Sequence, residues 1–225
     1  MTVRDDQEAE TLSVVEEAQG EQNALIDDIG TRYGAGAFDD EIRAARKDFD
    51  ALRGRVFDDD TIYPTHMAFF LEWYVIERAL TGREASPLVA ALEAGEVADA
   101  RRPLAEALAH SHRALFEVLR AEERGLRLYD FVGDCFWWAH LGRPWVGVVR
   151  GEIFEGRLIP WEGGVRLGPH VFYHPREAHD AIRCLVEARS AAGRLDTSLP
   201  FDLAEMRLRE SRFRNIAIDQ IYRDR

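Results

Sequence analysis

The chain has 225 residues, 46% of them hydrophobic and 31% charged, and a formal net charge of −12 at pH 7. These values are typical of a folded globular protein and argue against a disordered or fibrous chain. No apolar stretch approaches the roughly 18 residues of a membrane-spanning helix, and the acidic start of the sequence differs from the basic and then apolar start of a secretory signal. We therefore expect a cytoplasmic protein that has no membrane span.

The periodicity of the apolar residues predicts an α+β fold in three parts. Residues 1–110 form a helical lobe, residues 111–174 form a small β-barrel-like unit, and the helices of residues 175–225 pack on both. The elements expected in the lobe are an acidic helical hairpin over 5–55, a buried helix over 64–81 and short helices over 86–110.

The predicted hairpin carries two apolar stripes and most of the negative charge. Residues 1–60 contain 17 acidic and 7 basic side chains. The stripes predict either an internal core or a homodimer through the N-terminal helices. The acidic faces either keep the protein in solution or dock a basic protein partner. The stripe of the second helix consists of Phe38, Ile42, Ala45, Phe49 and Leu52.

The next predicted helix starts at Pro64 and is apolar on nearly every side between Met67 and Ile76, as a central buried helix should be. Its polar exceptions are Glu72 and Glu77. A buried glutamate with a raised pKa suits general acid or base catalysis, which is the basis of a hydrolase hypothesis. The competing hypothesis is that both carboxylates form ion pairs with arginine, which is abundant in this chain.

At His112 the spacing of the apolar residues changes from a helical period to alternation. This pattern predicts five short strands with many glycines over the following residues. The clearest strand covers residues 152–161, turns at Gly163 and Gly164, and is followed by a strand over 165–173. Such a unit is expected to form a strongly bent antiparallel sheet or a small barrel.

Aromatic side chains concentrate in this β unit. Alternate positions of a barrel strand point outward, so some of these rings would form a groove for bases or for a peptide. The alternative is that they fill the barrel or its contact with the helices. The candidate binding residues are Phe136, Trp137, Trp138, Trp145 and Trp161.

The C-terminal helices include an arginine-rich segment. A helix is expected from Pro175, and Asp202 with Glu205 forms a capping-box pattern that predicts the start of the last helix. The arginines of this helix either form a basic arm for RNA, an anionic membrane or a partner helix, or dock on the acidic helices of the same chain. The candidate arginines are Arg207, Arg209, Arg212 and Arg214.

Patterns for metal binding and nucleophilic catalysis are absent. His170, His174 and His179 form the densest histidine group, but four residues on a strand span roughly 13 Å, too far for a shared zinc ion. Cys135 and Cys184 form no CxxC pair and are expected to be reduced structural thiols. We find neither a GxSxG motif nor a phosphate-binding loop. The sequence therefore predicts no catalytic residue, no metal site and no cofactor.

Three segments of the β unit, Ser111–Val118, Leu128–Gly133 and Gly151–Pro160, follow an apolar helix that reads FLEWYVIER. In this combination, residues 64–185 resemble a loose group of uncharacterised bacterial proteins that pair such a helix with a small bent, barrel-like sheet. Some members of that group carry a C-terminal SEC-C-type metal motif. This chain lacks the motif, so the resemblance implies the fold and domain organisation but no metal site and no reaction.

The leading functional prediction is a non-catalytic adaptor or regulatory protein that acts through protein–protein interaction. The second is a module that associates with RNA or single-stranded DNA through the aromatic β face and the arginine segment. The third is the hydrolase described above. The most informative observation is whether the tryptophans face solvent or the core.

Overall fold

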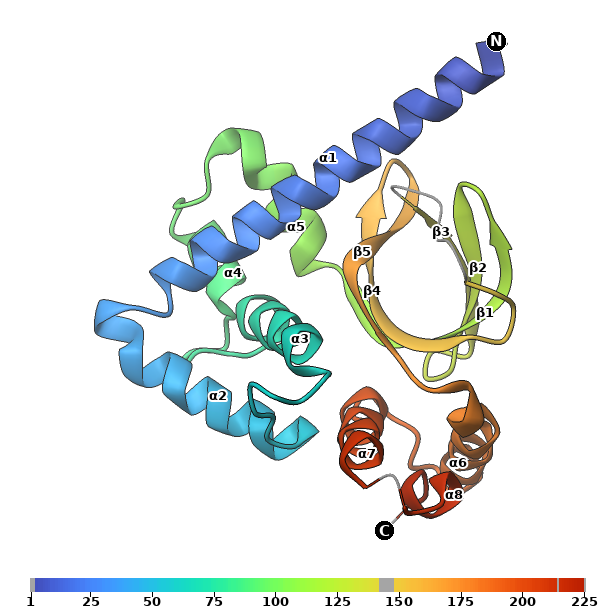
Figure 1. Ribbon diagram of the computed structural model, residues 1–225. Coiled ribbons are helices and arrows are strands. Elements are labelled where there is room, and N and C mark those ends of the chain that lie inside the picture. Colours follow the sequence, from blue (N-terminus) through green and yellow to red (C-terminus); the bar gives the residue numbers. More distant parts are fainter. Residues whose placement is uncertain (1–2, 142–147, 214, 225) are drawn as a thin grey trace.

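The computed structural model describes residues 3–141, 148–213 and 215–224, and of residues 3–16 it describes only the helical backbone. This part of the chain contains eight α-helices and a barrel of five strands, which confirms the predicted α+β class (Figure 1). The helices are α1 (Val3–Arg32), α2 (Asp39–Arg53), α3 (Tyr63–Ile76), α4 (Pro87–Glu93), α5 (Arg102–Ala109), α6 (His179–Ala191), α7 (Leu199–Arg212) and α8 (Ile218–Ile221). The strands are β1 (His112–Glu122), β2 (Gly125–Asp130), β3 (Cys135–His140), β4 (Ile153–Trp161) and β5 (Gly164–Tyr173). In the described ranges, no helix is both long and apolar enough to cross a membrane.

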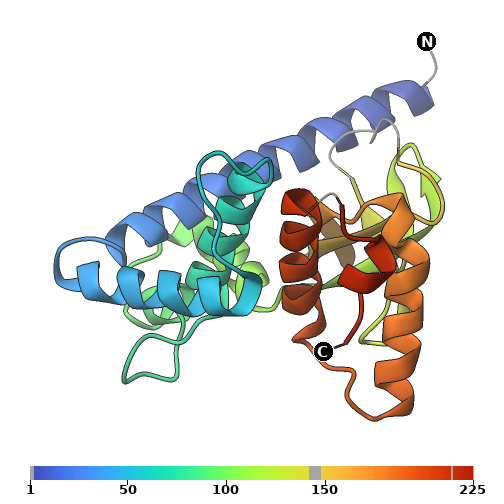
Figure 2. The same ribbon diagram turned by 60° about the horizontal axis from the view of Figure 1, so that its bottom comes forward.

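The helical lobe is built around α3, the central buried helix that the sequence predicts. α1 continues through Gly20 without a break. α1 and α2 diverge from the loop that joins them, and both contact α3 (Figure 2). Leu25 of α1 and Phe49 of α2 belong to the same buried cluster as Phe70 of α3. Most of the predicted stripe therefore contributes to an internal core, whereas Leu52 at its end is 40% exposed.

Two predicted helix boundaries are wrong. α3 ends at Ile76 and not at residue 81, because the amide N–H groups of Glu77 and Arg78 both donate to the carbonyl oxygen of Trp73 and close the helix there. α7 begins at Leu199, ahead of the predicted capping box, so Asp202 lies inside its first turn. There it accepts a hydrogen bond from Arg189 at 2.7 Å.

The five strands close into a barrel in the order β1, β2, β3, β5, β4. Neighbouring strands are antiparallel except for β3 and β5, which run parallel where Ala139 faces Val165. A closed ring with an odd number of strands cannot alternate in direction throughout. The barrel is confirmed, but a wholly antiparallel arrangement is wrong for this pair.

Helices cover part of the outer surface of this barrel. α3 and α5 lie against β5 and β4, and α7 lies against β1. On the C-terminal side, Leu115 and Ile153 of the barrel are buried with Ile182 and Leu203 of α6 and α7. Among the described helices, none packs extensively along the outer face of β2 and β3. The interior is filled by the side chains of Phe116, Leu128, Phe154, Leu158, Leu167 and their neighbours.

Candidate functional site

The outer face of β2 and β3 carries Arg127, Tyr129, Phe136 and Trp138, which we call the open face. In the antiparallel register, Arg127 lies opposite Trp138 and Tyr129 lies opposite Phe136. Because residues two apart on a strand share a face, all four side chains are on the same side of the sheet. Phe136 is 62% exposed and Trp138 is 39% exposed, which is unusual for large aromatic side chains.

Phe136 is the centre of the open face. Its ring centre is 5.6 Å from the guanidinium carbon of Arg127 and 5.5 Å from the ring centre of Tyr129. Trp138 lies against the backbone of β2, because a Cβ atom placed on Gly125 would be only 2.7 Å from the indole. Glycine at position 125 therefore allows this ring to lie close to the sheet.

The structure separates the five aromatic residues that the sequence nominates. Phe136 and Trp138 are exposed and lie together on the open face. Trp137 points to the opposite side of β3 and is partly buried against the barrel core, and Trp161 is half-buried with its ring 5.5 Å from that of His140. Trp145 lies outside the described residues. Sequence reasoning missed Arg127 and Tyr129, although their alternation within β2 could have identified them.

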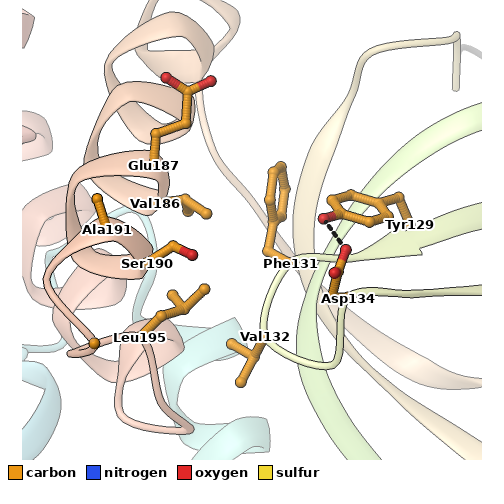
Figure 3. A pocket seen from close by; sticks show the side chains of 10 residues that line it. Tyr129, Phe131, Val132, Asp134, Val186, Glu187, Ser190, Ala191 and Leu195 are labelled. Atoms are coloured by element: carbon orange, nitrogen blue, oxygen red, sulfur yellow. Dashed lines mark hydrogen bonds between the residues drawn. The ribbon is translucent and has the colours of Figure 1, made fainter.

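A cleft of about 710 Å³ lies between the β2–β3 turn and the C-terminal half of α6, and we call it the turn cleft (Figure 3). In Figure 3 the side chains of Phe131 and Val186 lie between the turn and the helix, and Tyr129 and Asp134 lie on the turn side. Its apolar lining residues are Phe131, Val132, Val186, Ala191 and Leu195, and its polar ones are Tyr129, Asp134, Glu187 and Ser190. Tyr129 belongs to both the cleft and the open face, so the two surfaces are continuous.

The turn cleft is negatively charged. The hydroxyl of Tyr129 donates to Asp134 Oδ1 at 2.8 Å. This hydrogen bond, together with burial, raises the pKa of Tyr129 to about 12, so the phenol stays protonated and remains a donor at neutral pH. Within the described ranges, no arginine, lysine or histidine side chain forms an ion pair with Asp134 or Glu187. The cleft therefore presents two carboxylates that no described basic side chain neutralises.

A buried aspartate holds the turn that carries this cleft. Asp130 Oδ1 accepts hydrogen bonds from the backbone N–H groups of Val132 and Gly133, at 3.0 and 2.9 Å. Its other oxygen is 2.6 Å from His112 Nε2. Burial raises the pKa of Asp130, but the hydrogen bonds from His112 and the turn outweigh that effect and lower it. Asp130 therefore remains ionised and fixes the turn, a role that sequence reasoning did not predict.

Glu72 and Glu77 face arginines of the barrel. Arg157 donates to Glu72 at 3.4 Å and also bonds Glu77, and Arg113 donates to Glu77 at 2.8 Å. Burial raises the pKa of Glu77, but Arg113 and Arg157 outweigh it and hold the pKa at about 2. The prediction of a raised pKa is therefore wrong for Glu77. Both glutamates form ion pairs with arginine, as the competing hypothesis predicts.

The same network extends to a fully buried arginine of α2. Arg53 Nη1 donates to both carboxylate oxygens of Glu155, at 2.8 and 2.7 Å, and Arg113 donates to Glu155 at 2.7 Å. We call Arg53, Glu72, Glu77, Arg113, Glu155 and Arg157 the junction network, because it joins the helical lobe to β1 and β4. The Arg53 guanidinium is also surrounded by the rings of Phe49, Phe69, Phe172 and Phe201, at 5.0 to 5.9 Å.

The C-terminal arginines contact their own chain. Arg212 donates to Asp60 and, at 2.8 Å, to the carbonyl oxygen of Arg55. Arg207 pairs with Glu210 one turn along α7, and Arg209 is half-buried on the same helix. Arg214 lies outside the described residues. These contacts favour docking within the chain over a free basic arm.

The histidines and cysteines do not form a site. His174 is buried with Nδ1 3.3 Å from the Tyr222 hydroxyl, and His179 bonds the carbonyl oxygen of His174. Across the described part of the chain, no three His, Cys, Asp or Glu side chains are grouped to hold a metal ion. Burial and the nearby Asp130 raise the pKa of Cys135, which keeps it a thiol, and Cys184 is exposed on α6.

No protein-family profile matches the chain, and neither a curated protein nor a solved structure shows significant similarity to it.

Proposed function

We propose that this protein is a non-catalytic adaptor that binds an extended segment of a partner protein along the open face and the turn cleft. The observation that carries the proposal is the exposure of Phe136 and Trp138 on a barrel face that the described helices leave uncovered. Exposed aromatic residues and arginine are enriched in protein interfaces and supply much of their binding energy. Tyr129 extends this surface into the cleft.

The chemistry of the site indicates what the partner segment contains. The floor of the turn cleft is apolar, and its rim carries Asp134 and Glu187 without a basic partner among the described residues. An apolar side chain fits the floor, and lysine or arginine next to it would reach the carboxylates. The net charge of −12 attracts such a basic segment over a longer range.

The charged groups on the other side of the barrel support a non-catalytic reading. Glu72, Glu77 and Glu155 are each bonded to at least one buried arginine. Arg113 and Arg157 hold the pKa of Glu77 at about 2, so Glu77 is a weak general base and cannot act as a general acid near neutral pH. This arrangement leaves recognition, rather than proton transfer, as the function that the open face and the turn cleft support.

Selection from a library of random peptides displayed on phage, with the immobilised protein as bait, tests the proposal. We expect the enriched peptides to share an aromatic or aliphatic residue next to lysine or arginine. Fluorescence polarisation with one such peptide should show at least tenfold weaker binding to Phe136→Ser. The matched control is Phe57→Ser, because Phe57 is 51% exposed and also lies beside arginines, but outside the barrel. Equal effects of the two substitutions, or no enriched sequence, would contradict the proposal.

A second candidate is binding of single-stranded RNA or DNA at the open face. It is favoured by the strand order, which resembles that of the five-stranded oligonucleotide- and oligosaccharide-binding (OB) barrel, because such barrels bind oligonucleotides on the face of strands 2 and 3. It is also favoured by Arg127 beside the ring of Phe136. This support is an analogy of fold, which does not by itself establish function. The barrel unit also has eight arginines balanced by eight carboxylates, so it lacks a basic groove.

Fluorescence anisotropy with labelled 15-nucleotide oligo(dT) and oligo(U) at several salt concentrations tests this candidate. Nucleic-acid binding predicts an affinity that falls as salt rises and that Phe136→Ser reduces. An affinity that changes neither with salt nor with Phe136→Ser, or no binding at 50 mM salt, would exclude nucleic-acid binding at the open face.

A further inference from the structure

A second cavity lies away from the open face, between α1, α3 and β5, and we call it the helix cavity. Its volume is about 460 Å³, in the range of small-molecule sites in proteins. Its walls are mainly apolar, with Ile26 from α1, Met67, Phe70 and Leu71 from α3, and His170 from β5 at its side. Met67, Leu71 and His170 are partly exposed, so a small molecule can reach the cavity from solvent.

Glu72 provides a polar group in this apolar cavity. Its side chain is 3% exposed and lines the cavity. One carboxylate oxygen, Oε2, accepts a hydrogen bond from Arg157 Nε at 3.4 Å. The other oxygen, Oε1, is buried and has no hydrogen-bond partner in the described part of the structure. Buried polar atoms are nearly always hydrogen-bonded in native proteins. An unpaired oxygen of a buried carboxylate is costly, so we expect a hydrogen-bond donor to bind there.

The charge of the cavity lining favours a cationic donor. Asp27 and Glu72 are the charged residues that line the cavity, and no lining residue is arginine or lysine. Two buried arginines lie outside the lining: Arg157, which donates to Glu72 Oε2, and Arg166, whose charge also interacts with Glu72 and whose guanidinium donates to Gln22 Oε1 at 2.9 Å. A water molecule would satisfy Glu72 Oε1, but it would leave the apolar walls of a 460 Å³ cavity without a partner.

We propose that the helix cavity is a binding site for a small molecule with an apolar body and one protonated amine. The ammonium group donates to Glu72 Oε1, and the body packs between Ile26 of α1 and Phe70 of α3. Charge-assisted hydrogen bonds from ammonium to carboxylate are among the stronger ones, and the apolar walls supply the rest of the affinity. The site is independent of the proposed adaptor function, since it shares no residue with the open face or the turn cleft.

Three compounds that share a phenylethyl body and differ in their polar head test this proposal: 2-phenylethylamine, 2-phenylethanol and 3-phenylpropionate. Binding is measured by titration of ¹⁵N-labelled full-length protein in ¹H–¹⁵N correlation spectra. We expect the amine to bind at least tenfold more tightly than the alcohol and the carboxylate, with the largest shifts at the amides of Ile26, Ala68 and Leu71. Glu72→Gln, which keeps an acceptor toward Arg157, should remove the preference for the amine.

Two further variants keep the result decisive if Glu72→Gln does not fold. Ala68→Phe places a ring in the cavity and should abolish amine binding while Glu72 is retained. Glu187→Gln changes the turn cleft only and should leave the amine affinity unchanged. The proposal is overturned if the three compounds bind equally, if the carboxylate binds best, or if Ala68→Phe binds the amine as tightly as the unmodified protein does.

Discussion

The two sides of the barrel differ in what their charged groups do. On the side that faces the helical lobe, the arginines and glutamates of the junction network neutralise one another, and all of them are largely buried except Glu77, whose side chain is 28% exposed. On the open side, Arg127 lies over an exposed ring, and Asp134 and Glu187 have no basic partner among the described residues. The difference teaches that charged side chains join the two lobes on one side of the barrel, whereas on the other side two carboxylates keep no basic partner among the described residues.

The largest expected effect comes from breaking the junction network. Glu155→Gln leaves Arg53 and Arg113 buried without their shared carboxylate, and we expect a loss of about 3 to 5 kcal/mol in the free energy of unfolding. Urea unfolding followed by circular dichroism measures it. The matched control is Glu122→Gln, because its partner Arg120 has 72% of its side chain exposed and such surface pairs are worth about 0 to 1 kcal/mol. Similar losses for the two variants would contradict the comparison.

The second-largest expected effect is a loss of folding stability in acid, which comes from buried histidines. Burial and nearby arginines lower the pKa of His66 and of His174 to about 3. In the unfolded chain both titrate near 6.5, so below that pH the unfolded state binds protons that the folded state does not, and stability falls as pH decreases. From pH 7 to 5.5 we expect a loss of about 2 to 3 kcal/mol for the two histidines together.

Urea unfolding at the two pH values checks this effect. Glu77 and Asp130, whose pKa values are lowered, stay ionised over this range and contribute little to the change. Replacing the exposed His110 by asparagine should leave the pH dependence unaltered. A stability that is constant between pH 7 and 5.5 would show that His66 and His174 take up protons in the folded protein as readily as in the unfolded chain.

On the open side, we expect a moderate loss of stability when the glycine beneath Trp138 is replaced. In Gly125→Ala the new methyl group meets the indole at 2.7 Å and the carbonyl oxygen of Ala139 at 2.8 Å, so the ring or the strand must move. We expect a loss of about 1 to 3 kcal/mol, as is usual for overpacking, and a changed tryptophan fluorescence spectrum. Gly20→Ala is the control, because its Cβ meets nothing within 4 Å in α1, and it should be neutral or stabilising by up to about 1 kcal/mol.

The smallest expected effect on stability is that of Phe136→Ser. Since this side chain is 62% exposed, we expect the free energy of unfolding to change by less than about 0.5 kcal/mol. Phe116→Ala, inside the same barrel and fully buried, should cost about 3 to 5 kcal/mol. Comparable losses in urea unfolding would mean that Phe136 is part of the core and not of a binding surface.

Local patterns predicted much of the fold. The alternation after His112 and the glycine-rich turns identified a five-stranded unit, and the apolar run from Met67 to Ile76 identified the central helix. The helix boundaries were predicted less accurately. α3 ends at Ile76, because the amides of Glu77 and Arg78 both donate to the carbonyl oxygen of Trp73, and α7 begins three residues ahead of Asp202. Of the candidate aromatic residues, Phe136 and Trp138 lie on the open face and Trp137 and Trp161 do not, while Trp145 lies outside the described residues.

The sequence by itself determined the fold class, the order of helices and strands, and the presence of an aromatic β unit, because these depend on the spacing of apolar residues along the chain. Only the tertiary structure decided which aromatic rings are exposed, which carboxylates are neutralised, and where the cavities lie. The reason is physical: the closure of the barrel and the positions of α3 and α7 bring together Arg53, Glu77 and Glu155 from distant segments, and no local pattern records which side of a strand a helix will cover.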